Sequence, residues 1–229
     1  GEKLKQKYND LKLIGFDTGF FAHCLTGVNV SPELNYDVQY YGDIRKLDKN
    51  VFHGVDIVIH LAAISNDPMG NNFASVTEEI NSKASENIAK TAKLSGVRKF
   101  IFASSCSMYG TADSEAKKES DSLNPLTAYA KSKVYMEQVI EKLSDNKFQG
   151  TCLRYSTACG MTPRLRLDLV LNDFVASALT TGRIEILSDG TPWRPLIDVQ
   201  DMVRAIQWAV ERDDDQGGNF VAVNVGRNE

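Results

Sequence analysis

Two side chains four positions apart are the first candidates for chemistry in this sequence. Tyr129 and Lys133 begin a segment with a helical pattern, so they share one helical face. A free tyrosine has a pKa of about 10 and is a poor base at neutral pH, but a nearby ammonium favours the phenolate. The pair is therefore suited to take a proton from a hydroxyl, although a surface tyrosine over a lysine stem has the same spacing.

A serine cluster ends the apolar segment that precedes this helix. Residues 103–110 read Ala-Ser-Ser-Cys-Ser-Met-Tyr-Gly. A hydroxyl at the carboxyl end of a strand faces the first turn of the next helix, where it can share a hydrogen bond with a substrate oxygen. We therefore predict that Ser105, Tyr129 and Lys133 form a proton-transfer set. The alternative is a polar strand end whose hydroxyls are satisfied within the protein.

Asp17 closes the first short apolar segment, residues 11–16. In dinucleotide-binding units an acidic residue at such a strand end accepts hydrogen bonds from the adenosine ribose. A carboxylate there repels a 2′-phosphate, so Asp17 favours NAD over NADP. A capping or turn aspartate is the alternative, because no Gly-x-Gly-x-x-Gly loop is present in the sequence.

Strand-like and helix-like segments alternate along the chain, and they must position these residues. Further strands are predicted over residues 36–41, 55–60, 99–105, 150–155 and 220–225, and long helices over 72–94 and 126–143. Apolar strands separated by helices predict an α/β fold with a parallel sheet covered on both faces. Between residues 157 and 218 the strand signals weaken and turn signals multiply, which indicates a smaller lobe inserted before the last strand.

Composition narrows the class of protein. The net charge of −4 argues against nucleic-acid binding, and no apolar run is long enough for a membrane span. The amino-terminal residues are charged and do not look like a signal peptide. Four cysteines without a Cys-x-x-Cys pair indicate reduced thiols in a cytoplasmic protein without a metal site.

Together these segments resemble the extended short-chain dehydrogenase/reductases, in their NAD-dependent epimerase/dehydratase branch acting on nucleotide sugars. The resemblance rests on motifs in the family's order, which cover almost the whole chain: Ile14-Gly15-Phe16-Asp17, Gly42-Asp43-Ile44-Arg45, Val58-Ile59-His60-Leu61-Ala62-Ala63, Ile80-Asn81, Phe102 to Gly110, Tyr129 with Lys133, Leu153-Arg154-Tyr155-Ser156-Thr157, and Asp189 to Arg194. It implies a Rossmann-type doubly wound parallel sheet with a smaller substrate-binding lobe. Residues 1–157 and a returning strand at 219–226 would form the NAD-binding domain, and residues 158–218 part of the lobe.

The resemblance also implies roles for single residues. Ser105, Tyr129 and Lys133 match the catalytic set. The residues implied to bind NAD are Asp17, Asp43, Ile44, Leu61, Ala62, Ala63, Asn81, Tyr129, Lys133 and Tyr155. Those implied to bind the nucleotide sugar are Ser65, Ser107, Thr157 and Arg194, the last through the diphosphate.

The sequence departs from the family's pattern in four places. The Gly-rich loop and first strand would have to precede Gly1, and the rest of the substrate lobe would have to follow Glu229. Where family dehydratases carry an Asp-Glu pair after the serine, this chain has Cys106 and Ser107, which argues against 4,6-dehydration. The family's Arg-Tyr-Phe-Asn reads Arg154-Tyr155-Ser156-Thr157, so a substrate contact is altered there.

These features predict an NAD-dependent nucleotide-sugar epimerase that works through a transient keto sugar, with Tyr129 as acid and base. Two alternatives remain open: a net NAD-dependent sugar oxidoreductase, and a binding protein without catalysis on the same fold. Family members commonly pair through their long helices, so a homodimer is expected.

Overall fold

The computed structural model describes residues 1–65, 73–110, 116–186, 188–190 and 195–226. They divide into two compact units. The first unit comprises Gly1–Gly42, Thr157–Arg204 and Gly226–Glu229, and the second comprises Asp43–Ser156 and Ala205–Val225.

A parallel sheet forms the centre of the second unit. Its strands are β3 (Ile57–His60), β4 (Lys99–Ser105), β5 (Gln149–Tyr155) and β8 (Phe220–Val225), in the order β3-β4-β5-β8. All three pairings are parallel, and every residue of β5 is buried. Strands covered on both faces are mostly apolar, although β5 also buries Thr151 and Arg154. The predicted α/β fold with a parallel sheet is confirmed.

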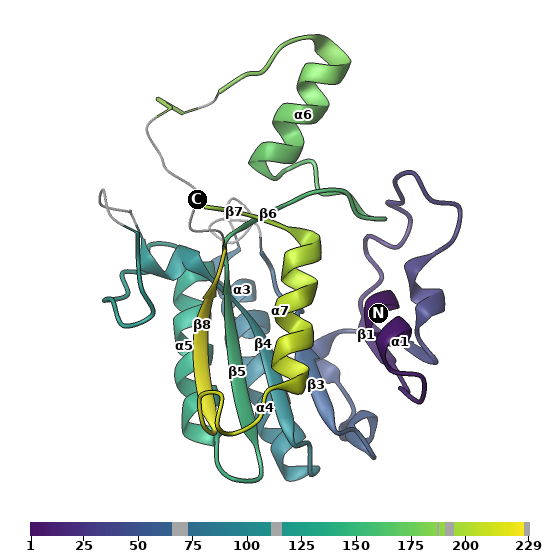
Figure 1. Ribbon diagram of the computed structural model, residues 1–229, viewed down its shortest axis with the longest axis vertical. Helices are drawn as coiled ribbons and strands as arrows, with labels where there is room; N and C mark the ends of the chain where they lie inside the picture. The colour runs from purple at the N-terminus through teal and green to yellow at the C-terminus, as the bar shows by residue number, and fades with distance from the viewer. Residues whose placement is uncertain (66–72, 111–115, 187, 191–194, 227–229) are drawn as a thin grey trace. The chain divides into compact units, whose positions relative to one another are not determined.

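Helices cover both faces of this sheet (Figure 1). On one face lie α4 (Ser85–Leu94) and α5 (Ala128–Leu143), and on the other lie residues 205–211 of α7 (Val199–Glu211). The helix predicted over 72–94 differs in detail: α3 (Ala74–Glu78) continues into a π-helical turn, η4 (Glu79–Ala84), and then into α4. Residue 72 lies outside the described residues. Three short 3₁₀ helices complete the unit: η2 (Ile44–Lys46), η3 (Lys49–Phe52) and η5 (Cys106–Tyr109).

Aromatic rings from β4 form the core between the sheet and these helices. Phe100 and Phe102 are fully buried, and the His60 ring stacks on Phe102 with centroids 6.0 Å apart. His60 Nε2 pairs with Ser85 Oγ at 2.8 Å, and burial lowers the pKa of His60 to about 3. A neutral, hydrogen-bonded histidine in the core is a structural one.

The first unit holds two small parallel sheets. In one, β1 (Ile14–Asp17) pairs with β2 (Val38–Tyr41); in the other, β6 (Thr157–Cys159) pairs with β7 (Leu196–Asp198). The unit also contains α1 (Glu2–Lys7), η1 (Pro32–Asn35) and α6 (Val170–Thr181). Arg164 connects segments of the unit that are far apart in the sequence, because its guanidinium donates to the Phe21 carbonyl at 2.9 Å and to Glu33 at 2.8 Å.

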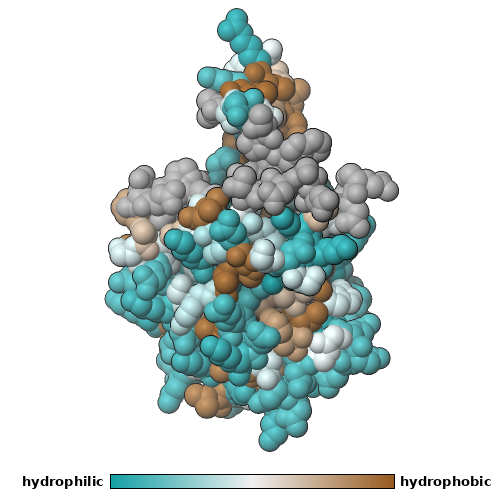
Figure 2. Space-filling model, turned by 90° about the vertical axis from the view of Figure 1, so that its left-hand side faces the viewer, coloured by the Kyte–Doolittle hydropathy of each residue, from teal (hydrophilic) through white to brown (hydrophobic). Residues whose placement is uncertain are grey.

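Helix α6 has no buried residue, and its apolar side chains are open to solvent. Figure 2 shows brown, apolar side chains at the top, where α6 lies in Figure 1. The exposed apolar residues of α6 are Val170, Leu171, Val175 and Leu179. No helix among the described residues has the length and apolar character needed to cross a membrane.

Candidate active site

The amino-terminal turn of α5 carries the candidate acid–base tyrosine. The Thr127 hydroxyl caps the helix by accepting from the Ala130 amide at 3.1 Å, which fixes where α5 begins. Tyr129 therefore lies in the first turn, where the positive end of the helix dipole favours negative charge. Ser132 Oγ donates to the Tyr129 carbonyl at 2.6 Å and so ties down the backbone of that turn.

Lys133 lies one turn further on and is only 3% exposed. Its ammonium donates to the Ala103 carbonyl of β4 at 2.7 Å, and Nζ lies 5.2 Å from the centroid of the Tyr129 ring. Burial lowers the pKa of Lys133 to about 8, and the charge of Glu137 partly opposes this effect. A cation with so little water around it acts strongly on a neighbouring phenolate.

Ser105 ends β4, two residues after the carbonyl that Lys133 binds. Its hydroxyl caps η5 by accepting from the Ser107 amide at 3.2 Å. The Ser107 hydroxyl is buried and has no hydrogen-bond partner among the described residues. Because an unpaired buried hydroxyl is costly, this hydroxyl is suited to a substrate oxygen. The structure thus places Ser105 and Lys133 at the same strand end, with Tyr129 beside Lys133.

A backbone strip follows β3, and Asn81 holds it in place. The Asn81 amide lies in the π-helical turn; its oxygen accepts from the Ile64 amide at 2.8 Å, and its nitrogen donates to the Ile64 carbonyl at 2.9 Å. Asn81 is 3% exposed, whereas Leu61 at the start of the strip is 57% exposed. Asn81 thus fixes the backbone at Ile64, directly after the strip, in which Leu61 is exposed and Ala62 and Ala63 are half-buried.

The predicted adenosine ligands lie in different units. Asp17 ends β1 in the first unit; its carboxylate is exposed and accepts from the Gly19 amide at 2.6 Å. Asp43 belongs to the second unit and caps η2, and its hydrogen bonds with Arg45 lower the pKa of the Asp43 carboxyl. The neighbouring Ile44 is buried. The exposed carboxylate of Asp17 suits ribose hydroxyls, so the residues present fit a dinucleotide.

The remaining predicted ligands are dispersed. Tyr155 pairs with Ser105 across β4 and β5 and is 6% exposed, and burial raises the pKa of its phenol. Ser65 is exposed at the end of the strip after β3. Thr157 begins β6 in the first unit, where its amide donates to the Pro195 carbonyl at 2.9 Å. Arg194 lies outside the described residues.

Sequence analysis did not predict a buried ion pair next to this site. Glu137 on α5 and Arg154 on β5 approach to 2.7 Å and are 5% and 7% exposed. One signal could have revealed Glu137: it lies four residues after Lys133 and between the apolar Met136 and Ile140, on the face of the helix that is buried. Among the described residues no group of three or more His, Cys, Asp or Glu side chains could hold a metal ion.

Comparisons with known proteins identify the family. The family model described as "NAD dependent epimerase/dehydratase family" matches residues 22–226. An uncharacterised UDP-glucose epimerase of Bacillus subtilis is 28% identical over 160 residues, which are 69% of this chain and 49% of that protein. A dTDP-D-glucose 4,6-dehydratase of Dictyostelium discoideum is 25% identical over 221 residues, covering 88% of this chain and 50% of that protein. The chain thus spans about half the length of these curated relatives.

A solved structure is similar over nearly the whole chain. The UDP-glucuronic acid 4-epimerase of Bacillus cereus, in complex with UDP-glucuronic acid and NAD, superposes with a TM-score of 0.81 and 24% sequence identity. The match covers 99% of this chain and 73% of that one. At this identity the likeness shows the fold, and it confirms the Rossmann-type prediction. The family is shown by the family model, whose match includes Tyr129 and Lys133. The chain belongs to the NAD-dependent epimerase/dehydratase family.

Proposed function

We propose that the protein is a nucleotide-sugar epimerase that uses NAD. The observation that carries this proposal is the buried Lys133 ammonium, 5.2 Å from the Tyr129 ring centroid and bound to β4 two residues before Ser105. Tyr129 takes the proton from a sugar hydroxyl and later returns it. Lys133 favours the phenolate form of Tyr129, and Ser105 holds the reacting oxygen in place.

When bound, NAD supplies a site that accepts a hydride from the sugar carbon and gives it back. Epimerisation requires no net oxidation, so the residues around the cofactor have to retain it through the turnover. We assign this task to Asp17, Asp43 and the strip from Leu61 to Ala63, with Asn81 acting by holding the strip. Ile44, Lys133 and Tyr155 complete the proposed cofactor set.

The residues after Ser105 favour epimerisation over dehydration. Expelling a hydroxyl as water needs a group that can donate a proton to it. Cys106 and Ser107 follow Ser105 in η5, and neither is a carboxylic acid. The unpaired Ser107 hydroxyl is instead suited to binding the sugar. We propose Ser65, Thr157 and Arg194 as further substrate ligands.

The proposal extends to the organisation of the protein. Residues 1–157 with the strand at 219–226 would serve NAD, and residues 158–218 would form part of the substrate lobe. We further propose that the protein acts in the cytoplasm as a homodimer.

Incubation of the natural full-length protein with single nucleotide sugars tests the activity. UDP-glucose is the first probe, followed by UDP-glucuronic acid and dTDP-glucose, each without added NAD, and ¹H NMR identifies the product. We expect an isomer of the substrate and no accumulation of NADH. A product lighter by one water would identify a dehydratase instead. Turnover that depends on stoichiometric NAD would identify a net oxidoreductase. Bound NAD with no product from any sugar would support a binding protein.

A further inference from the structure

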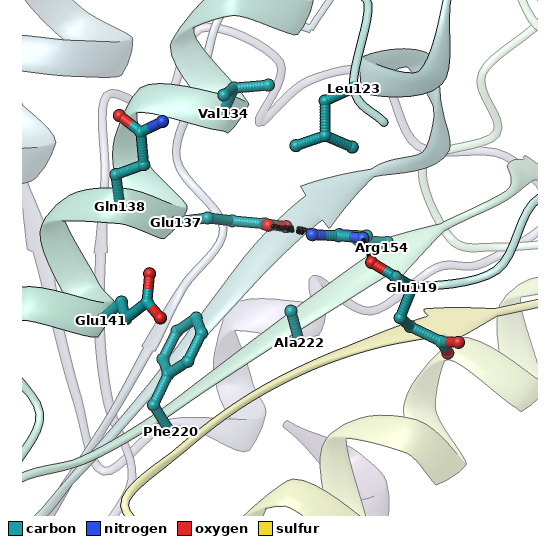
Figure 3. A pocket seen from close by; sticks show the side chains of 9 residues that line it. All are labelled: Glu119, Leu123, Val134, Glu137, Gln138, Glu141, Arg154, Phe220 and Ala222. Atoms are coloured by element: carbon teal, nitrogen blue, oxygen red, sulfur yellow. Dashed lines mark hydrogen bonds and ion pairs between the residues drawn. The ribbon is translucent and has the colours of Figure 1, made fainter. Parts of the chain in front are cut away.

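The buried pair of Glu137 and Arg154 is not accounted for by the proposed chemistry. Arg154 Nη2 lies 2.7 Å from Glu137 Oε2, and Nε lies 3.0 and 3.2 Å from the two carboxylate oxygens. Figure 3 shows the two side chains pointing toward one another from α5 and β5. Removing two charges from water is costly, and apolar residues of similar volume often stabilise a core equally well. Stability alone therefore gives little reason for an ion pair here.

The carboxylate of Glu137 connects α5 to the end of β4. Ser104 Oγ donates to Glu137 Oε1 at 2.6 Å, and Ser104 lies directly beside Arg154 in the register of β4 and β5. One turn earlier on the helix, Lys133 binds the Ala103 carbonyl. Helix α5 is thus fastened to two consecutive residues of β4, immediately before Ser105.

The guanidinium of Arg154 connects the pair to η5. Nη1 donates to the Tyr109 hydroxyl at 2.8 Å and to the Glu119 carbonyl at 3.1 Å. Tyr109 in turn donates to Asn224 Oδ1 of β8 at 2.7 Å. Tyr109 is the last residue of η5, and Ser105 is the residue that caps its start. One guanidinium therefore holds the segment that contains Ser105 and Ser107.

We propose that the Glu137–Arg154 pair is a positioning device that sets Ser105 and η5 against Tyr129 and Lys133 on α5. This inference rests on the proposed function, because it gives those residues a reaction to perform. Glu137 and Arg154 act through α5 and η5 and do not touch the reacting atoms. They line a pocket of about 360 Å³, shown in Figure 3, whose lining includes none of Ser105, Tyr129 and Lys133.

The decisive variant replaces both charges in the full-length protein. Glu137→Gln alone would leave the buried Arg154 guanidinium without a compensating negative charge and could prevent folding. The double variant Glu137→Leu/Arg154→Met leaves no unpaired charge, so we expect it to fold. Its kcat should fall about 10- to 100-fold, because small displacements of reacting groups are costly, while KM for the nucleotide sugar should stay within about two-fold. The matched control Glu141→Gln, one turn along α5 in the same pocket, should leave both unchanged.

A second measurement does not depend on activity. Hydrogen–deuterium exchange should become faster in the double variant for peptides spanning 105–110 and 127–133, and stay the same in α4. Exchange like that of the parent in those peptides would overturn the proposal, whatever the protein catalyses. Faster exchange with unchanged kcat would also overturn it, because the pair would then be structural only. If the parent turns over no nucleotide sugar, the proposed function fails while the exchange measurement still decides whether the pair holds η5 to α5.

A milder variant covers the case in which the double variant fails to fold. Tyr109→Phe keeps the ion pair but removes the hydroxyl that joins Arg154 to η5 and to Asn224. We expect faster exchange in 105–110 only, and a several-fold lower kcat. Parent values for both measurements would contradict the proposal.

Discussion

Removing a single oxygen tests Tyr129 at the centre of the candidate site. Tyr129→Phe should keep the fold and NAD binding, because the helix cap at Thr127 and the Lys133 anchor are untouched. Turnover should fall by about 10²- to 10⁴-fold, the usual loss for a general acid–base group. The control is Tyr135→Phe on the same helix, whose hydroxyl binds Glu86. Similar turnover in both variants would show that the base is a different residue.

Burial of the Lys133 ammonium should lower the free energy of unfolding. Its pKa is about 8 when folded and about 10.5 when unfolded, so the unfolded chain binds more protons between these values and stability rises with pH there. Lys133→Met should therefore stabilise the protein at pH 7, by about 2 kcal/mol once the lost hydrogen bond is subtracted. The gain should shrink above about pH 8.

Thermal melts of this variant without NAD, at pH 7 and at alkaline pH, measure the effect. The exposed neighbour Lys131 provides the control, and Lys131→Met should not change stability in this way. A loss of stability at pH 7 for Lys133→Met would contradict the prediction.

Asp17 should decide which dinucleotide binds. Its exposed carboxylate repels a 2′-phosphate, so Asp17→Ala should weaken NAD binding and reduce the preference over NADP. Calorimetric titration of the full-length parent and variant with each dinucleotide measures both affinities. Equal affinities of the parent for NAD and NADP would contradict the proposal that Asp17 selects NAD.

Residue types and spacing predicted that Ser105, Tyr129 and Lys133 lie near one another, but not which residues hold them in place. Tyr129 and Lys133 could be paired from sequence because a helix relates residues four apart. Ser105 could be assigned to the same site because the carboxyl end of a strand faces the first turn of the next helix. The contact between Glu137 and Arg154 depends on how α5 lies over β5, which no local pattern records. The bonds from Asn81 to Ile64 depend in the same way on the packing of η4.

Among the elements, the turn that ends η5 should be the least tolerant of substitution. Gly110 has φ of 77°, and a Cβ there would lie 2.3 Å from the Asn124 carbonyl oxygen. Gly110→Ala should lower the free energy of unfolding by about 3–4 kcal/mol, combining backbone strain with this clash. Gly96 has φ of 87° but nothing within 4 Å of such a Cβ, so Gly96→Ala lacks the clash and should cost only about 1–2 kcal/mol. Urea unfolding measures both variants, and equal losses would contradict the steric argument.

Elements with one dominant pattern were predicted well, and those with mixed patterns were not. Strands β4, β5 and β8 lie within a residue of their predicted bounds, because continuous apolar runs mark buried parallel strands. Helix α7 was missed although apolar residues recur at 199, 202, 203, 206 and 210, because turn signals surround it on both sides. Helix α6 was also missed, although apolar residues recur at 170, 171, 174, 175, 178 and 179.

For the whole molecule we expect a homodimer. Helices α4 and α5 lie side by side on one face of the sheet and pack against each other, so together they form a helical surface that a second copy can cover (Figure 1). A two-fold dimer is the commonest closed assembly. Light scattering of the full-length protein at micromolar concentration should give twice the chain mass, and the mass of one chain would remove this expectation.

The pairing of β5 with β8 has a consequence for how the protein is made. Gly150 lies beside Phe220, so the chain leaves the sheet after β5 and returns only after the whole stretch from 157 to 219. On the ribosome, β3, β4 and β5 are synthesised well before β8, and the edge of β5 that pairs with β8 stays open during that time. Contacts between residues so distant in sequence form slowly. Folding of the second unit should therefore be limited by this late closure, and the nascent chain should be most prone to aggregate, and most in need of a chaperone, during that interval.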